Sequence, residues 1–198
     1  MNTETQSTRQ HILNVGYELI VEKGFYNVGL AQLLNHAGVP KGSFYHYFKS
    51  KEQFGEALIE EYFAQYRAKM DAHFSDSTAN GYDKLMGYWA KWLEMDDGMC
   101  ATQRCLVVKL SAEVSDLSES MRLSLLNGAN RIVAILADCV QNGIDDGSVK
   151  VEDAYQTANQ LYHLWIGASL MSKLNQNVEP MKQALKTTQH LLSGQHPF

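Results

Sequence analysis

The sequence has little proline, little cysteine and no long apolar run, and each shortage excludes a class of structure. Three prolines in 198 residues permit long helices, because proline disrupts a helix interior more than any other residue. Three cysteines, an odd number, do not make a disulfide framework and favour free thiols in a reducing cytoplasm. No stretch approaches the roughly 18 consecutive apolar residues of a membrane span, and the polar N-terminus lacks the apolar core of a signal peptide.

What is present is typical of a folded helical protein. Hydrophobic residues make up 45% of the chain and charged residues 20%, which leaves ample material for a core. Apolar residues recur at helical spacing from end to end, and no strand alternation bounded by hairpin turns is found. The pattern predicts an all-α protein of about nine helices, a group of three followed by six more.

Caps and chain breakers set the expected helix boundaries. Ser7 with Gln10 predicts a capping box at the start of the first helix, and Ser50 with Gln53 predicts another at the fourth. A loop is expected from Ile144 onward. The expected helices are Thr8–Lys23, Leu30–Ala37, Lys41–Phe48, Ser50–Phe74, Tyr82–Glu94, Thr102–Val114, a seventh from Asp116 or Ser118 to about Asn142, Glu152–Leu174, and a ninth from near Pro180 to Leu192.

Charge is spread unevenly along the chain. The net charge is -5, yet residues 1–54 hold five Lys or Arg and four Asp or Glu, while the rest of the chain holds twelve and eighteen. The segment His36–Lys51 contains three lysines and no acid. A polyanion is therefore attracted to this segment more than to any other of similar length.

The second and third expected helices are joined by a short turn that contains Gly38, as in a helix-turn-helix. In that motif the second helix lies in the major groove of DNA, although a solvated helical hairpin has the same periodicity. Lys51, in the first turn of the fourth helix, is expected to meet a phosphate together with the helix N-terminus. The residues placed to meet base edges are Lys41, Gly42, Ser43, Tyr45 and His46, whereas Phe44 and Phe48 share the inward face.

The string Gly38-Val-Pro-Lys-Gly-Ser-Phe-Tyr-His-Tyr-Phe-Lys-Ser-Lys-Glu52 resembles the DNA-binding signature of the tetracycline-repressor (TetR) family, and so does Gly24-Phe25. The resemblance covers about residues 8–55. It implies a helix-turn-helix domain over residues 1–55 and a helical regulatory, ligand-binding and dimerisation domain over residues 56–198, divided inside the fourth helix. It also implies a transcriptional regulator, a repressor, of a near-palindromic double-stranded DNA operator. Gly29 departs from the pattern, because many members carry a hydroxyl residue there that caps the second helix.

The expected eighth helix is apolar on nearly every side. From Thr157 to Leu174 its only formal charge is Lys173, and Gly167 allows another helix to approach closely. Such a helix is predicted to be buried all round. A second copy of the chain makes that burial easier, and the family resemblance implies a homodimer formed by the last two long helices.

Aromatic residues are dense in the second part of the chain. They are either ordinary core or the lining of a small-molecule pocket. The seven histidines show no ligand-like pair on one helix face, so no metal and no cofactor is expected. The candidate pocket residues are Tyr66, Trp89, Trp92, Tyr162 and Trp165.

Cys105 lies in or near the first turn of the expected sixth helix, where the helix dipole favours a thiolate. Lys109 is one turn on and Lys173 is a second candidate cation, although a small buried apolar residue is the ordinary role of a cysteine. Cys139 is expected in the core, and Cys100 is a candidate resolving partner.

The run from Cys105 to Ser118, and the region around Lys173, resemble the electrophile- and oxidant-responsive group of the same family, typified by the N-ethylmaleimide-responsive repressor. The aligned cysteine in that group is the sensor. The resemblance therefore implies a reactive electrophile or a small molecule as effector, with Cys105, Lys109 and Lys173 as sensor residues.

Two other functions compete with this interpretation. A thiol-dependent enzyme is disfavoured because no phosphate loop, zinc motif, nucleophile elbow or dinucleotide fingerprint is present. A helical interaction protein that no longer binds DNA is disfavoured by the acid-free basic segment His36–Lys51.

Overall fold

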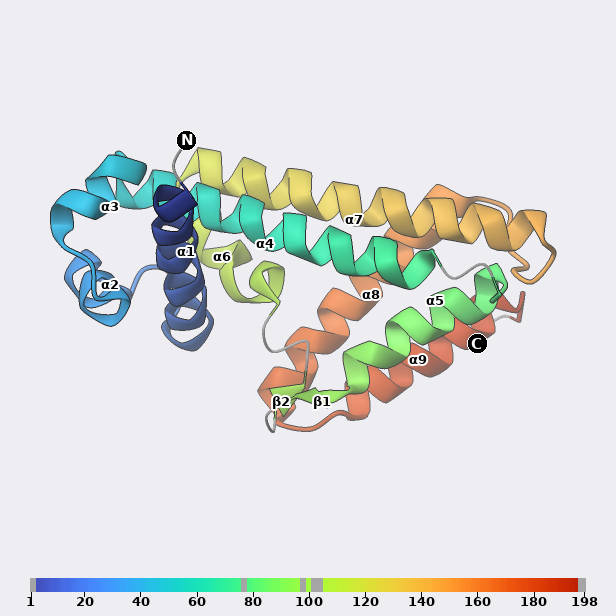
Figure 1. Cartoon of the computed structure of the whole chain (residues 1–198). Helices are drawn as coiled ribbons and strands as arrows, with labels where there is room; N and C mark the ends of the chain where they lie inside the picture. The colour runs from blue at the N-terminus through green and yellow to red at the C-terminus, as the bar shows by residue number, and fades with distance from the viewer. Residues whose placement is uncertain (1–2, 76–77, 97–98, 101–104, 196–198) are drawn as a thin grey trace. The chain divides into compact units, whose positions relative to one another are not determined.

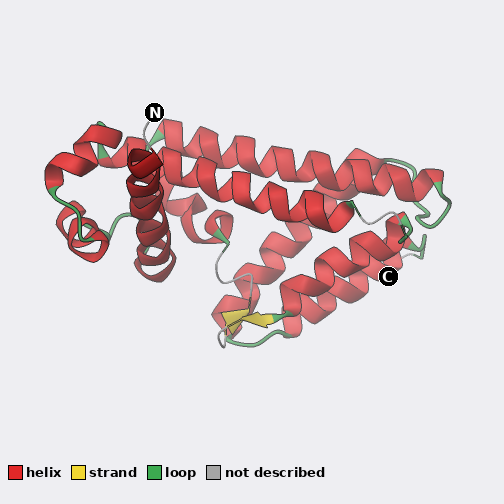
Figure 2. Ribbon diagram, in the orientation of Figure 1, coloured by secondary structure: helices red, strands yellow, loops and turns green. Residues whose placement is uncertain are grey.

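A computed structural model describes residues 3–75, 78–96, 99–100 and 105–195, and nearly all of this part of the chain is helical (Figures 1 and 2). The prediction of an all-α fold with nine helices is confirmed within those ranges. The helices are α1 Thr3–Lys23, α2 Leu30–Ala37, α3 Lys41–Tyr47, α4 Lys51–Phe74, α5 Gly81–Ala90, α6 Leu106–Leu117, α7 Glu119–Asp145, α8 Ala154–Asn175 and α9 Glu179–Leu192, with a 3-10 turn, η1 Lys91–Leu93, after α5.

A short strand pair interrupts the helical pattern. β1 Met95–Asp96 and β2 Met99–Cys100 pair antiparallel, with Met95 opposite Cys100. The expectation that no strand is present was therefore wrong at these four residues. Two residues in a strand are too few to show the alternation over about 4–8 residues by which strands are recognised in a sequence.

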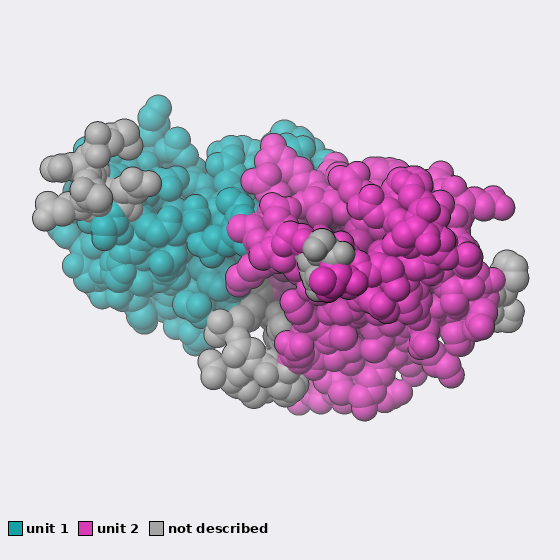
Figure 3. All heavy atoms as spheres, turned by 45° about the vertical axis from the view of Figure 1, so that its right-hand side comes forward, with its two compact units in different colours: residues 1–65, 109–128 teal, residues 66–108, 129–198 magenta. Residues whose placement is uncertain are grey.

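The chain divides into two compact units, coloured in Figure 3. The first holds residues 1–65 and 109–128, and the second holds residues 66–108 and 129–198. The divisions fall within α4, α6 and α7, so each of these helices contributes residues to both units. The first unit is larger than the N-terminal segment because residues 109–128 join it. The functional boundary near residue 55 stays a prediction.

Apolar side chains from α1, α2, α3 and α4 build the core of the N-terminal part. Ile12, Leu33, Phe44 and Phe54 are each no more than 2% exposed. Gly16 permits the close contact of α1 with the Phe54 ring, since a Cβ there would lie 2.3 Å from that ring. This core fixes α3 on the first unit and decides which of its faces is left exposed.

The expected capping box at Ser50 is formed in part, since Gln53 binds the N–H of Lys49 rather than that of Ser50, and the expected box at Ser7 is absent. The Ser50 hydroxyl accepts the Gln53 N–H at 3.1 Å, and the Gln53 side chain accepts the Lys49 N–H at 2.6 Å. The box at Ser7 was wrong, because α1 begins at Thr3 and Ser7 lies inside it. No proline or glycine precedes Ser7, so nothing in the sequence stops the helix from starting earlier.

Other boundaries differ by a few residues. The α5 helix ends at Ala90 and continues as η1, and α7 runs to Asp145, past the expected start of the loop at Ile144. Ser118 rather than Asp116 caps α7, because its hydroxyl accepts the N–H of Met121 at 3.4 Å. The expected start of α6, Thr102, lies outside the described residues, and α6 begins at Leu106 in the described part.

In the second unit, backbones approach closely where α5 meets α7. A Cβ at Gly81 would lie 2.3 Å from the Cα of Gly143, so neither position has room for a side chain. The Gly81 N–H also donates to the Asp146 carboxylate at 2.8 Å. Elsewhere in this unit α8 packs on α9, and the buried Trp165 indole donates to the Thr188 hydroxyl at 2.9 Å.

By length and composition alone, α7 is long and apolar enough to cross a membrane, with a mean hydropathy of 1.4 over its most apolar stretch. Its apolar side chains Ile132, Leu136 and Val140 are nevertheless buried within the chain, while Arg131 and Asp138 are exposed and seven residues apart. One charged face and one buried face are typical of a core helix of a folded domain.

Candidate functional site

The turn between α2 and α3 is set by Gly38. This residue has a φ of 63°, in the left-handed region that favours glycine, and it ends α2. The Val39 N–H returns to the Leu34 carbonyl at 3.2 Å, and Pro40 is the N-cap of α3. The sequence predicted the bounds of α2 correctly and those of α3 to within one residue.

The α3 helix has one buried and one exposed face. Phe44 and Phe48 are 0% and 1% exposed, with their ring centroids 5.2 Å apart, and both lie within 5.6 Å of the Phe54 ring. This confirms the prediction that the two phenylalanines share the inward face. Tyr45 is 48% exposed on the other face.

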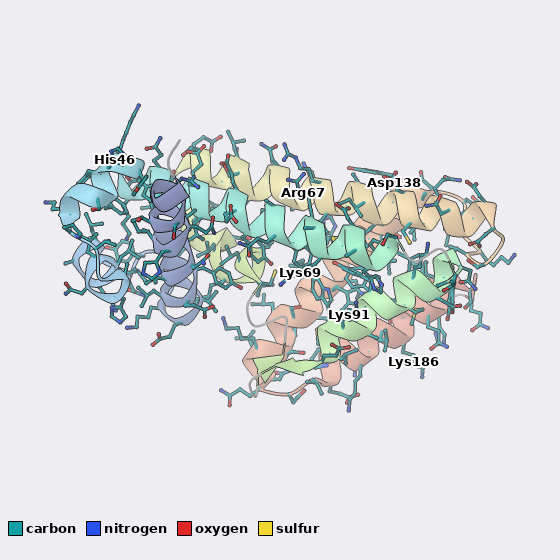
Figure 4. All side chains as sticks on the ribbon, viewed as in Figure 1. His46, Arg67, Lys69, Lys91, Asp138 and Lys186 are labelled. Atoms are coloured by element: carbon teal, nitrogen blue, oxygen red, sulfur yellow. The ribbon has the colours of Figure 1, made fainter. Side chains whose placement is uncertain are left out.

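The residues predicted to meet base edges gather on that exposed face. Lys41, Gly42 and His46 are exposed there and Ser43 is partly buried; His46 is labelled on α3 in Figure 4. The Lys41 ammonium lies 5.8 Å from the centroid of the Tyr45 ring. A Cβ at Gly42 would meet no atom within 4 Å, so the backbone is open to a partner at this point. The face offers a cation, a hydroxyl, aromatic donors and an accessible backbone.

Lys51 is placed differently from the other candidates. Its ammonium donates to the Phe25 carbonyl at 2.8 Å and lies 4.5 Å from the centroid of the Phe25 ring. Burial lowers the pKa of Lys51, and the carboxylates of Glu52 and Glu113 offset part of that effect. In this structure the ammonium thus secures the segment after α1 with one of its three N–H donors, and the side chain is only partly buried, so its expected contact with a phosphate stays a prediction.

Gly29 is the N-cap of α2 and makes no side-chain hydrogen bond there. The Gly29 backbone is extended, as a cap requires. Because glycine stands where many family members have a hydroxyl residue, no side-chain oxygen accepts an N–H of α2 here. Nothing lies within 4 Å of a Cβ at Gly29 either.

The five candidate pocket residues, together with Tyr88, form one aromatic cluster in the second unit. The rings of Trp89 and Trp165 stack with their centroids 4.7 Å apart and an interplanar angle of 10°. The centroid of the Trp92 ring lies 5.2 Å from that of Trp89 and 5.8 Å from that of Trp165. The hydroxyls of Tyr66 and Tyr88 are 2.7 Å apart. Sequence reasoning missed Tyr88, which lies one residue before Trp89 and whose ring centroid is 4.6 Å from that of Trp89.

The cluster is buried enough to change the acidity of its hydroxyls. Burial raises the pKa of Tyr66, Tyr88 and Tyr162 well above the ordinary tyrosine range. All three hydroxyls therefore stay neutral at physiological pH. The indole N–H of Trp89 is buried and has no hydrogen-bond partner within the described residues.

Cys105 is partly exposed, is not part of a disulfide and directly precedes α6. It lies within electrostatic range of Tyr66 and Tyr162, which brings it to the aromatic cluster. Cys139, by contrast, is buried, and burial raises the pKa of its thiol to about 11. The prediction that Cys139 belongs to the core is confirmed.

The two candidate cations near Cys105 are placed in different ways. The Lys109 ammonium donates to the Glu22 carbonyl, at the end of α1, at 3.3 Å. Lys173 is exposed in the last turn of α8. Arg104, the basic residue adjacent to Cys105 in the sequence, lies outside the described residues, and so does the side chain of Cys100.

The exposed face of α8 carries apolar residues. Leu170 and Met171 are each 46% exposed and Leu174 is 68% exposed, and Gly167 on the same face has no atom within 4 Å of a Cβ. The expectation that α8 is buried on all sides was therefore wrong for a single chain. The sequence shows that α8 is apolar on nearly every side, but one copy of the chain buries only part of the surface of this helix.

Among the described residues, no group of three or more His, Cys, Asp or Glu lies together as a metal site would require.

Comparisons with known proteins match the chain along most of its length. Residues 12–58 match the family described as bacterial regulatory proteins, tetR family, and residues 81–188 match the tetracyclin repressor-like C-terminal domain. The sequence is 38% identical over 195 residues to the HTH-type transcriptional repressor NemR of Escherichia coli K12, covering 98% of each chain. It is 33% identical over 178 residues to the HTH-type transcriptional repressor DhaR of a Mycobacterium species, covering 89% of this chain and 88% of DhaR. The crystal structure of E. coli NemR in its reduced form superimposes with a TM-score of 0.86 at 40% identity, covering 93% of this chain and 97% of that one.

Proposed function

The chain belongs to the tetR family of bacterial regulatory proteins, and we propose that it is a homodimeric repressor released from its operator when an electrophile or oxidant modifies Cys105. The resemblance of the DNA-binding segment to this family is thereby confirmed, and the protein is a DNA-binding transcriptional regulator rather than an enzyme. The proposal concerns its DNA-contacting residues, its dimer interface and its effector. We expect the protein in the cytoplasm, where its DNA lies.

The DNA-contacting surface that we propose is the exposed face of α3. Lys41, Ser43, Tyr45 and His46 provide a charge and hydrogen-bonding groups there, and Gly42 leaves the backbone accessible. The buried rings of the inward face hold this helix rigidly on the unit, as base readout requires. Lys51 is assigned a phosphate contact beside this face, made by the N–H donors that its bond to the Phe25 carbonyl leaves over.

We propose that two chains associate through the exposed apolar face of α8. Leu170, Met171 and Leu174 expose apolar surface there, and Gly167 gives a second helix room to approach. A two-fold dimer presents two recognition helices, so the operator is expected to be a near-palindrome with half-sites about one helical turn of DNA or somewhat more apart.

The observation that carries the sensor proposal is the contrast between two described thiols. Cys105 is partly exposed and sits directly at the N-terminus of α6, where the helix dipole favours a thiolate, whereas Cys139 is buried and its pKa is raised. In the proposed reaction the Cys105 thiolate adds to the electrophilic carbon of a quinone, the carbon–carbon π bond breaks, and the resulting enolate takes a proton from water. With hypochlorite the thiolate accepts chlorine from hypochlorous acid and hydroxide leaves.

The test compares the wild type with Cys105→Ser and the matched control Cys139→Ala. Each is exposed to a quinone, an aldehyde or hypochlorite, and its affinity for operator DNA is measured by fluorescence anisotropy. The wild type and Cys139→Ala should release the operator, while Cys105→Ser should bind it and stay bound. Equal release of Cys105→Ser and the wild type would contradict the sensor proposal.

A second candidate effector is a reversible ligand of the aromatic cluster. The buried indole N–H of Trp89, which has no partner within the described residues, favours a ligand that brings a hydrogen-bond acceptor. Release of both the wild type and Cys105→Ser by a non-reactive aromatic compound would support this alternative. Loss of that release in Trp89→Phe, which deletes the N–H, would locate the ligand.

A further inference from the structure

Two charged side chains of α6 hold the segment that follows α1. The Glu113 carboxylate accepts the backbone N–H of Phe25 at 2.7 Å, although the two residues are 88 positions apart. One turn earlier on α6, the Lys109 ammonium donates to the Glu22 carbonyl at 3.3 Å. All four residues belong to the first compact unit. The end of α1 and the residue after it are thus attached to α6 by two hydrogen bonds.

Phe25 is held on both sides of its backbone. Glu113 takes its N–H, and Lys51 donates to its carbonyl at 2.8 Å. The Phe25 side chain is 1% exposed, and it lies against Gly55 of α4, where a Cβ would come within 2.6 Å of the ring. Phe25 follows Gly24, whose φ of 84° ends α1 and turns the chain toward α2. The position of Phe25 therefore sets how the chain enters the helix-turn-helix.

Glu113 lies on the helix that Cys105 precedes. Glu113 lies seven residues after Leu106, the first residue of α6, which corresponds to about 10 Å at a rise of about 1.5 Å per residue. Since a hydrogen bond is lost when its heavy atoms separate beyond about 3.5 Å, a displacement of α6 by about an ångström breaks the contact between Glu113 and Phe25. A carboxylate is also a stronger acceptor of a backbone N–H than a neutral group, so loss of this contact releases more of the hold on Phe25 than loss of a neutral hydrogen bond would.

We infer that Glu113 is a positioning residue that couples Cys105 to the DNA-binding helices, an inference that rests on the function proposed above. Modification of Cys105 displaces α6, Glu113 releases the Phe25 N–H, and the segment that leads into α2 and α3 changes position. Lys109 supports the same attachment at Glu22. Neither residue touches DNA in this scheme, and each acts through the backbone at the end of α1.

The primary test measures the ratio of operator Kd after and before alkylation of Cys105 with N-ethylmaleimide. Coupling between sites in proteins is typically about 5–150-fold, and we expect a ratio in this range for the wild type. Glu113→Ala should bring the ratio close to one, while Glu113→Gln, which keeps an acceptor oxygen, should retain most of the effect. Asp116→Ala is the matched control, because Asp116 is an exposed acid on the same helix. Circular dichroism establishes that each variant is folded.

A second measurement does not depend on Cys105. Coupling is reciprocal, so binding of operator DNA should alter hydrogen exchange at the Phe25 amide in the wild type and leave it unaltered in Glu113→Ala. If alkylation releases the wild type and Glu113→Ala equally, the inference is overturned while the sensor proposal stands. If alkylation releases neither, the sensor proposal fails, and the exchange result decides the inference: an operator-dependent change confined to the wild type supports it, and no change overturns it.

Discussion

Replacing Gly167 by alanine separates the stability of one chain from the stability of a dimer. Gly167 lies inside α8, and its added methyl group would meet no atom within 4 Å in a single chain. Glycine in a helix interior is less favourable than alanine by about 0.8–1.0 kcal/mol, so the substitution should stabilise the folded chain by about 1 kcal/mol. If a second helix packs on this face, the same methyl group lies in the contact between the two helices and weakens their association.

The penalty in a dimer follows from its symmetry. An extra methyl group in a packed contact costs about 1–3 kcal/mol, and a two-fold interface contains the position twice, so dimerisation should weaken by about 2–6 kcal/mol. At about 1.4 kcal/mol for each tenfold change, the dimer Kd should rise about 30-fold or more. Sedimentation equilibrium measures this constant, and urea unfolding measures the stability of the chain.

Gly42→Ala provides the matched control, because Gly42 is equally open within the chain but lies on α3. It should leave the dimer Kd unchanged and weaken operator binding, since the methyl group occupies the space where DNA approaches. A dimer Kd that is the same in the wild type and Gly167→Ala would refute the assignment of this α8 face to the interface.

Three further predictions concern the DNA-binding helix and the thiols. Phe44→Ala should destabilise the protein by about 3–5 kcal/mol in urea unfolding, because the ring is fully buried, whereas Tyr45→Ala should leave stability nearly unchanged and alter preference among operator variants. Lys41→Ala should lower the slope of log Kd against log salt concentration by about one in DNA titrations, with an unchanged slope arguing against any contact of this ammonium with DNA. Iodoacetamide at pH 8 should label Cys105 long before Cys139 by mass spectrometry, because burial raises the Cys139 pKa to about 11 and lowers its thiolate fraction; equal labelling would show that Cys139 is accessible.

Local signals in the sequence were sufficient for the helix-turn-helix. Gly38 and Pro40 mark the end of α2 and the start of α3, and Phe44 and Phe48 mark the buried face by their spacing. These features depend on residues within one or two turns of each other. Ser7 misled because a cap residue inside a stretch free of breakers does not prevent a helix from starting earlier.

Contacts between distant segments were not accessible from the sequence. The hydrogen bond of Lys51 to Phe25 was not predicted because the two residues are 26 positions apart, and Glu113 gave no signal because its partner is 88 positions away. No glycine, proline or cap residue marks the start of α6 at Leu106, and the expected start at Thr102 lies outside the described residues. Periodicity shows that α8 is apolar but contains no information on whether its own chain or another covers it.

The clustering of Trp89, Trp92 and Trp165 gives the protein an intrinsic spectroscopic probe of one site. These are the three tryptophans of the sequence, and all of them lie in the second unit. The ring stack of Trp89 and Trp165 at 4.7 Å brings two indoles close enough for their electronic transitions to couple. Tryptophan fluorescence and near-ultraviolet circular dichroism therefore report on the surroundings of the aromatic cluster. The helix-turn-helix, which contains tyrosine and phenylalanine but no tryptophan, contributes nothing to the tryptophan emission, so an effector titration can be followed without a label.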